Sequence, residues 1–214
     1  MKKQFKYAIG EILIVIVGIS IAFSMNKCAE IQKNDALKKQ YLENIKSDVE
    51  IDKQHLKNNS DAIESKIKTI NEVIPLLDTG TPASGKSIYK IFNVFNLTEF
   101  YPKDITYQTM INSGDFKLID DFGLKTAIEE HYSNYKSILK DYERQEIIHK
   151  DYLGNYMVFN MDFGAMRKGE SGLKDEKLFK NILQSMSGSL IIKKSATERG
   201  IKSCDSLLTV LNKI

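Results

Sequence analysis

Proline, glycine and cysteine are all scarce in this chain of 214 residues, which contains three prolines, twelve glycines and two cysteines. The shortage of helix-breaking residues, together with plentiful Lys, Glu, Ile and Leu, favours helices. The net charge of +3 is small and its basic residues are scattered, so nothing in the composition indicates a groove for nucleic acid. We therefore expect an all-α protein that does not bind nucleic acid.

The usual catalytic and metal-binding patterns are missing as well. The histidines, His55, His131 and His149, are far apart and form neither an H-x-x-x-H nor an H-E-x-x-H pair. Neither Cys28 nor Cys204 belongs to a C-x-x-C pair, and no G-x-S-x-G sequence is present. The sequence thus predicts no catalytic residue, no metal site and no cofactor, and we do not expect an enzyme.

One stretch, Gly80 to Ser87, matches the phosphate-binding pattern G-x-x-x-x-G-K-[ST] in full. A true P-loop follows a buried strand and lies within a parallel sheet, where backbone amides and the lysine hold phosphates. Here a long amphipathic helix is expected before the stretch, and no alternation of strands and helices follows it. We interpret it as a polar loop between helices and do not predict nucleotide binding.

Long apolar runs are absent except for one near the N-terminus. Residues 8–25 contain a single charged residue, Glu11. At about 1.5 Å rise per residue, a helix of this length nearly crosses the hydrocarbon core of a bilayer. Its apolar run is longer than that of a usual cleavable signal peptide, although Ala22-Phe23-Ser24 resembles a cleavage site. We therefore predict a transmembrane signal anchor, with cleavage as the alternative.

The basic residues before this run set its expected orientation. Lys2, Lys3 and Lys6 precede it, and the positive-inside rule then places the N-terminus in the cytoplasm. The predicted organisation is a cytoplasmic head (1–7), a membrane helix (8–25) and an extracytoplasmic helical bundle (26–214). In location this is a single-pass protein of the inner (cytoplasmic) membrane with a periplasmic domain.

Three residues of the predicted membrane helix are candidate contacts with other helices. Glu11 lies near the cytoplasmic end, where its carboxylate reaches lipid headgroups or meets a basic or polar group of a partner helix. Gly18 and Ala22 form a small-x-x-x-small pair, which allows two helices to approach closely. Besides the lipid bilayer, we expect a membrane protein partner or a second copy of the chain here.

Part of the N-terminal region resembles a known pattern. The residues that carry it are Gly10-Glu11-Ile12, Ile14 to Ala22, Asn26 and Glu30. They are similar to the motif G-E-I-x-L-I-x-x-G-I-x-I-A, followed by N-N-W-N-E, of an uncharacterised bacterial family of single-span membrane proteins. Cys28 replaces the tryptophan of that motif. The resemblance implies a membrane anchor and a helical extracytoplasmic domain, and implies no activity. A second similar stretch consists of Tyr107, Met110, Ser113-Gly114-Asp115 and Leu118-Ile119.

The region from Ala29 to Leu77 has helical periodicity. Apolar residues recur every seven positions, which is typical of a long helix packed against partners in a bundle. Asp52 and Asn59 occupy positions where apolar residues are expected, and Pro75 is predicted to bend or end the helix. The repeating residues are Leu42, Val49, Leu56, Ile63, Ile70 and Leu77.

The rest of the chain predicts further helices and short connections. We expect a loop over residues 78–86, a short buried helix in 88–97, a turn from Thr98 to Pro102, and a helix over 104–112 ended by Gly114. Two more helices follow over 173–186 and 189–211, separated by Ser187-Gly188. Before these two helices we expect a long helix over 122–159. Its inner face is formed by Leu124, Ile128, Tyr132 or His131, Tyr135, Leu139, Tyr142, Ile147, Tyr152 and Tyr156.

The fold we expect is one membrane helix joined to an antiparallel bundle of about four main helices. This organisation, without catalytic residues, predicts a non-enzymatic membrane-anchored interaction or scaffold protein, an accessory subunit of a cell-envelope complex. The alternative is a bundle that binds a small ligand beside its tyrosine row and signals through a membrane partner. Cys28 and Cys204 are expected to be free thiols, or bonded if the C-terminus folds back to the membrane.

Overall fold

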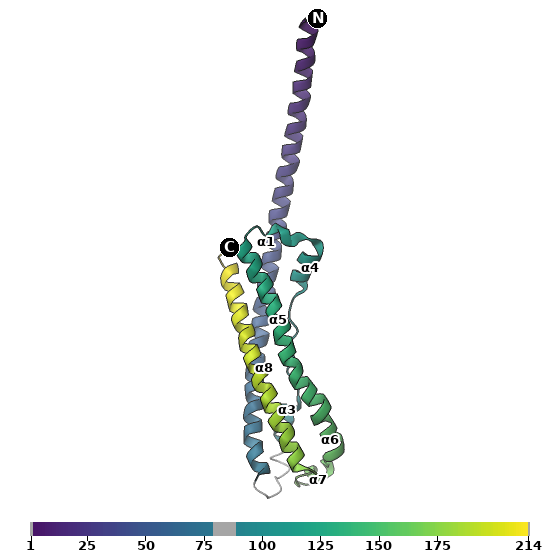
Figure 1. The fold of residues 1–214 in the computed structure, drawn as a ribbon, viewed down its shortest axis with the longest axis vertical. Helices are drawn as coiled ribbons and strands as arrows, with labels where there is room; N and C mark the ends of the chain where they lie inside the picture. Colours follow the sequence, from purple (N-terminus) through teal and green to yellow (C-terminus); the bar gives the residue numbers. More distant parts are fainter. Residues whose placement is uncertain (1, 79–88, 214) are drawn as a thin grey trace.

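The computed structural model describes residues 2–78 and 89–213 (Figure 1). Its largest element is the helix α1, Lys2–Leu77, whose 76 residues span about 114 Å at 1.5 Å per residue. The N-terminal part of α1 projects alone beyond the rest of the molecule, and the C-terminal part packs within a bundle (Figure 1). No break separates the two parts, so the projecting helix and the bundle share one backbone.

The bundled part of α1 buries the predicted seven-residue repeat. Val49, Leu56, Ile63 and Ile70 are at most 1% exposed, while the end members of the repeat are partly buried. The helix ends two residues after Pro75, as the sequence predicts.

In the described part of the chain, two further long helices complete the bundle. They are α5, Phe122–Ile148, and α8, Glu176–Leu211. Figure 1 shows α1 and α5 running in the same direction and α8 running opposite to both. Helix α8 packs against both α1 and α5, which make few direct contacts with each other. The predicted all-α class with an antiparallel bundle is confirmed.

Helix α8 is continuous, so the predicted break at Ser187-Gly188 is wrong. A glycine inside a helix costs only about 1 kcal/mol relative to alanine. Met186 and Leu190 on either side are fully buried, and their burial outweighs that cost. The bundle consequently has one long C-terminal helix where we expected two.

Helix α5 continues through the π-helical turn η2, His149–Leu153, into α6, Gly154–Asn160. The prediction of one helical stretch over residues 122–159 is therefore close to the observed limits. The π turn contains one more residue than an α turn, which advances the inner face by one position. Tyr152, predicted to point inward, is 57% exposed, and Leu153 is buried in its place. Ile147 is also exposed, contrary to prediction.

In the described part of the chain, four further short helices lie toward the two ends of the bundle. They are α3, Phe92–Phe95; α4, Ile105–Ser113; η1, Asp115–Leu118; and α7, Phe163–Arg167. Gly114 ends α4 with a φ of 76°, the left-handed conformation expected there. Asp121 caps α5 by accepting a hydrogen bond of 2.8 Å from the backbone N–H of Leu124.

Residues 96–104, which we call the strap, are extended and return from the end of α3 to the start of α4 (Figure 1). The predicted turn from Thr98 to Pro102 is therefore wrong. Nine extended residues cover about 30 Å at 3.3 Å per residue, a distance that would need about twenty residues of helix. The strap thus occupies the place of a fourth helix with far less side-chain bulk.

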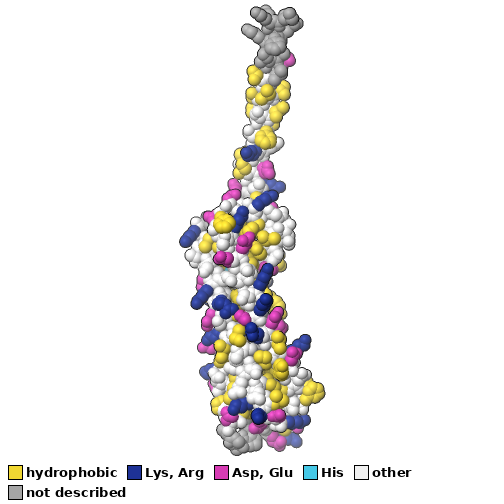
Figure 2. All heavy atoms as spheres, in the orientation of Figure 1, with side chains coloured by type: hydrophobic (Ala, Val, Ile, Leu, Met, Phe, Trp, Pro, Cys, Tyr) yellow, Lys and Arg dark blue, Asp and Glu magenta, His cyan; other side chains and the backbone are white. Residues whose placement is uncertain are grey.

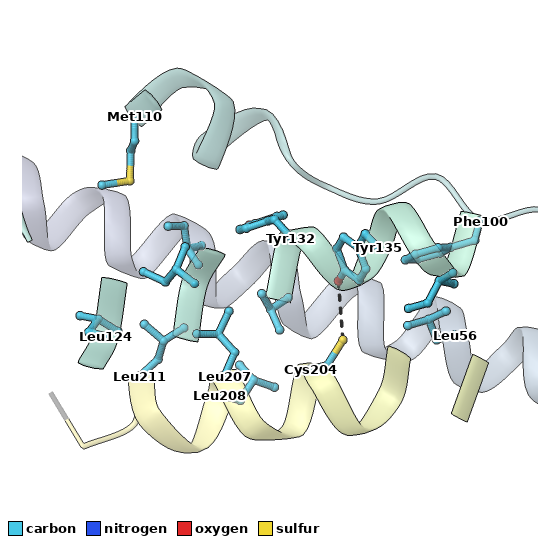
Figure 3. Close-up of a cluster of buried hydrophobic side chains, with 14 of the residues drawn as sticks. Leu56, Phe100, Met110, Leu124, Tyr132, Tyr135, Cys204, Leu207, Leu208 and Leu211 are labelled. Carbon is cyan, nitrogen blue, oxygen red and sulfur yellow. Dashed lines mark hydrogen bonds between the residues drawn. The ribbon is translucent and has the colours of Figure 1, made fainter. Parts of the chain in front are cut away.

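Both cysteines are free. Cys28 is exposed on the projecting part of α1, whereas Cys204 is fully buried in α8. Figure 3 shows Cys204 among buried side chains, with its Sγ atom 3.6 Å from the hydroxyl oxygen of Tyr135. Burial raises the pKa of the Cys204 thiol to about 11, so this thiol is unreactive at neutral pH.

Candidate functional site: a polar layer beneath the strap

The three candidate residues of the predicted membrane helix lie on the projecting part of α1. Glu11 and Ala22 are exposed, and a Cβ atom added at Gly18 would meet nothing within 4 Å. Separations of seven and eleven residues place all three within about 20° of one line along the helix. They share a face, and no described residue of the same chain covers that face. Their role in helix packing or partner contact stays a prediction.

The projecting part of α1 exposes an apolar stretch. In Figure 2 apolar side chains gather on it between the grey tip and the charged side chains near the bundle, while the bundle surface mixes both signs of charge. Among the described residues, α1 is the helix long and apolar enough to cross a membrane, and none of its most apolar window is buried.

A second candidate site lies inside the bundle, where α1 meets the strap. The two interruptions of the apolar repeat, Asp52 and Asn59, are 1% and 7% exposed. The Asp52 carboxylate accepts hydrogen bonds of 3.1 and 3.0 Å from the backbone N–H of Lys103. The Asn59 amide donates to the carbonyl of Glu99 at 2.8 Å. Both polar side chains therefore satisfy the backbone of the strap.

Lys66 extends the same series, seven residues after Asn59. Its side chain is 4% exposed, and its ammonium donates to the carbonyl of Asn96 and to the hydroxyl of Thr98. Asp52, Asn59 and Lys66 thus form a polar stripe along α1, aligned by its helical repeat with the extended strap.

Residues of α8, α5 and the π turn also contact the strap or its N-terminal boundary. The Lys193 ammonium of α8 donates to the Thr98 carbonyl at 2.7 Å and to Gln145 Oε1, and it lies 4.3 Å from the centre of the Tyr142 ring. At the π turn, the His149 Nε2 group donates to the carbonyl of Phe95. An extended segment without strand neighbours would leave buried backbone groups unpaired, and these side chains replace the missing strand.

Two lysines therefore lie buried side by side without an ion pair to a carboxylate among the described residues. Burial lowers the pKa of Lys66 to about 8. Burial, together with the nearby positive charge of Lys66, lowers the pKa of Lys193 to about 7. The charge that holds the strap consequently changes close to neutral pH.

Another buried polar group, His131, lies nearer to the end of the bundle from which α1 projects. His131 accepts or donates one hydrogen bond of 2.9 Å between Nδ1 and the Ser203 hydroxyl, and its Nε2 atom has no partner among the described residues. Burial lowers the pKa of His131 to about 4, so the imidazole is neutral at physiological pH. Burial also raises the pKa of the neighbouring Tyr132 hydroxyl. Burial therefore favours the uncharged forms of both His131 and Tyr132.

A groove runs beside the strap, between it and α5. It consists of three adjoining hollows of about 140, 300 and 740 Å³. Pro102 and Leu139 line both the first and the second, while Leu97, Glu143 and Glu146 line both the second and the third. The strap is narrower than a helix, and this groove is the space that remains.

The predicted tyrosine row borders this region only in part. Tyr132, Tyr135, Tyr142 and Tyr156 are buried as expected. Most of their hydroxyl groups form hydrogen bonds within the protein. The Tyr142 hydroxyl, for example, lies 2.7 Å from the Thr197 hydroxyl. In the described residues, no three His, Cys, Asp or Glu side chains lie close enough together to hold a metal ion. The P-loop-like stretch, Gly80 to Ser87, lies outside the described residues.

Sequence reasoning missed the residues that define the strap site. Lys66, Gln145 and Lys193 were not predicted to be inside, because charged and amide side chains are mostly exposed. One signal was available, since Asp52 and Asn59 are followed by Lys66 at the same seven-residue interval.

Comparison with known proteins identifies a family without a known role. No curated protein and no solved structure matches the chain. A family model matches residues 11–152, which include Glu11, the polar stripe, the strap and α5. The match spans about two thirds of the chain, and the protein therefore belongs to a family of unknown function, DUF6090.

Proposed function

We propose that this protein is a non-enzymatic, membrane-anchored interaction or scaffold protein that serves as an accessory subunit of a cell-envelope complex. The observation that supports this most is the continuity of α1. From Leu13 to Met25 its projecting part is apolar on all sides, with Ile14, Ile19 and Phe23 each at least 65% exposed. The same helix forms a wall of the bundle. A membrane helix joined in this way holds the bundle at a fixed distance from the lipid.

In this proposal the apolar part of α1 crosses the inner membrane with its N-terminus in the cytoplasm, and the bundle lies in the periplasm. The two cysteines provide a test of that orientation. Cys28 is exposed just beyond the apolar run, and Cys204 is buried. A membrane-impermeant maleimide should label intact cells at Cys28, and Cys28→Ser should abolish labelling. Labelling only after the inner membrane is permeabilised would reverse the orientation.

The face containing Glu11, Gly18 and Ala22 is the proposed contact with a membrane partner or a second copy. Purification in mild detergent followed by mass spectrometry should recover the full-length protein with a partner or as an oligomer. Gly18→Leu should disrupt that association, because a large side chain prevents close helix approach. Ser20→Leu, on the opposite face of the helix, is the matched control. Recovery of the wild-type protein alone and monomeric would contradict the proposal.

A small-ligand-binding bundle that signals through a membrane partner is the second candidate function. The groove beside the strap is the observation that favours it, since binding sites in bundles form between facing elements. A thermal-shift screen of the full-length protein with small metabolites would separate the two, because a scaffold gains no stability from them.

A further inference from the structure

We propose that the groove between the strap and α5 binds an extended, basic peptide segment of a partner protein, which adds as a strand beside the strap. This inference rests on the proposed interaction function and names the chemistry of the partner. Three features of the groove support it: an unpaired backbone edge, an uncompensated acidic rim and an apolar floor.

The backbone edge is the first feature. All six residues from Leu97 to Pro102 line the middle hollow of about 300 Å³. Successive side chains of an extended chain point to opposite faces, so six consecutive residues line one hollow only if the backbone edge itself forms the wall. Within the described residues, no N–H group from Thr98 to Tyr101 donates a hydrogen bond, and the Phe100 carbonyl accepts none. Successive backbone groups of an extended chain point to opposite edges, so the N–H groups of Thr98 and Phe100 and the Phe100 carbonyl share one edge, on which Lys193 already occupies the Thr98 carbonyl. The unpaired part of that edge is a template for another strand.

The strap is held in its extended form at several points along its length. The hydrogen bonds from Asn59, Lys66 and Lys193 occupy the carbonyls of Glu99, Asn96 and Thr98. A segment held in extended form before binding loses less conformational entropy when a partner strand pairs with it.

The acidic rim is the second feature. Glu99, Glu143 and Glu146 line the middle hollow and are exposed, and none of them forms an ion pair among the described residues. The hollows on either side contribute Asp104, Glu129 and Asp151 against two exposed lysines, Lys136 and Lys150. The buried Lys193 is the remaining cation, and its ammonium is used by the strap and Gln145. A basic segment complements this rim.

The floor and mouth are the third feature. Leu139, Tyr142 and Phe100 provide apolar surface inside the hollow, and Tyr101 at its edge is 68% exposed. A strand with alternating basic and apolar side chains would direct the apolar set to this floor and the basic set to the glutamates.

The test uses the full-length protein in detergent micelles and a short fluorescent peptide of alternating lysine and valine. Fluorescence anisotropy should show saturable binding, and a peptide with glutamate in place of lysine should not bind. The double variant Glu143→Lys, Glu146→Lys should weaken binding by about tenfold or more. Glu130→Lys, at an exposed position of α5 that does not line the groove, is the matched control and should bind normally.

A second peptide tests the strand pairing itself. N-methylation of alternate backbone amides keeps the charge and side chains but removes the donors that strand addition needs, and it should abolish binding. Equal binding of the methylated peptide, complete competition by a simple alkylamine, or equal affinity of Glu143→Gln, Glu146→Gln and wild type would each overturn the proposal. These outcomes do not depend on whether the membrane helix binds a partner. Failure of peptide binding would therefore leave the proposed anchoring function intact, and failure of helix association would leave the peptide site intact.

Discussion

The two parts of α1 are one helix in two environments. From about Lys38 onward, α8 and the strap bury one side of the helix. On that side, buried apolar residues and the polar stripe each repeat every seven residues. Before that point the helix is mostly exposed, and it is apolar on all sides from Leu13 to Met25. In the bundle, contacts within the chain determine helix stability, whereas the projecting part depends on what surrounds the protein.

The largest expected effect on stability comes from shortening an apolar side chain to alanine in the bundled part of α1, and the same kind of substitution in the projecting part is its control. Leu56→Ala should lower the free energy of unfolding by about 2–5 kcal/mol, because Leu56 is fully buried against α8 near Gly200. Ile16→Ala should leave it unchanged within about 0.5 kcal/mol, because Ile16 is 53% exposed. Denaturant titration of the full-length protein in micelles measures both. Equal effects would mean that the projecting part belongs to the folding unit.

A pair of neighbouring asparagines tests the polar stripe. Asn59→Ala removes the donor to the Glu99 carbonyl and should cost about 1–3 kcal/mol, because that carbonyl is left unpaired beside the core. Asn58→Ala changes an exposed residue one position away and should cost less than about 0.5 kcal/mol. Hydrogen exchange should show faster exchange at the Lys103 and α4 amides in Asn59→Ala only. An unaltered Asn59→Ala protein would show that the strap does not depend on the stripe.

The buried lysines predict an effect of pH. Their pKa values are about 8 for Lys66 and about 7 for Lys193 in the folded protein, below the ordinary 10.5. Between pH 7 and 9 the unfolded chain therefore binds more protons than the folded one, and stability should rise with pH by on the order of 2 kcal/mol. Above pH 9 the raised pKa values of Cys204 and the buried tyrosines oppose this rise. Thermal unfolding across this range measures the effect.

The matched variant for the pH effect is Lys66→Met, Lys193→Met. It should remove the rise between pH 7 and 9, because the other described group with a resolved shift near this range, Cys204, lowers stability as pH rises. A rise that persists in this variant would assign the pH dependence to other groups.

The smallest expected effect concerns Glu11. Glu11→Gln should leave bundle stability within about 0.5 kcal/mol of wild type, because Glu11 is exposed and distant from the bundle. Its consequence should be confined to membrane association and co-purification. If both of these are also unchanged, the projecting helix is only an anchor, and partner binding must be sought in the bundle.

The sequence predicted the elements that a periodic pattern can reveal. The repeat from Leu42 to Leu77 gave the bundled part of α1, and Gly114 marked the end of α4 because its local chemistry is specific. The strap could not be predicted in this way. It is stabilised by Asp52, Asn59, Lys66 and Lys193, from helices far away in the chain, while its own residues resemble a turn.

The inner face of α5 shows a second limit. From Leu124 to Gln145 the buried residues follow ordinary helical spacing, and extrapolation then predicts Tyr152. The π turn inserts a residue after Ile148, and nothing in the local sequence marks it. At this turn His149 donates to the Phe95 carbonyl, a tertiary contact that the local sequence does not reveal.

Because α1 is unbroken, a movement of its projecting part also moves the bundle. From Met25 to Leu77 the helix extends for about 78 Å without a hinge. A membrane helix tilted by 20°, the average for such helices, would displace the far end of the bundle sideways by roughly 27 Å. Rotation of the anchor about its own axis would likewise turn the strap and its groove toward a different neighbour. If the projecting part of α1 lies in a bilayer, small changes in its tilt or rotation there would cause large changes in the position of the bundle surface.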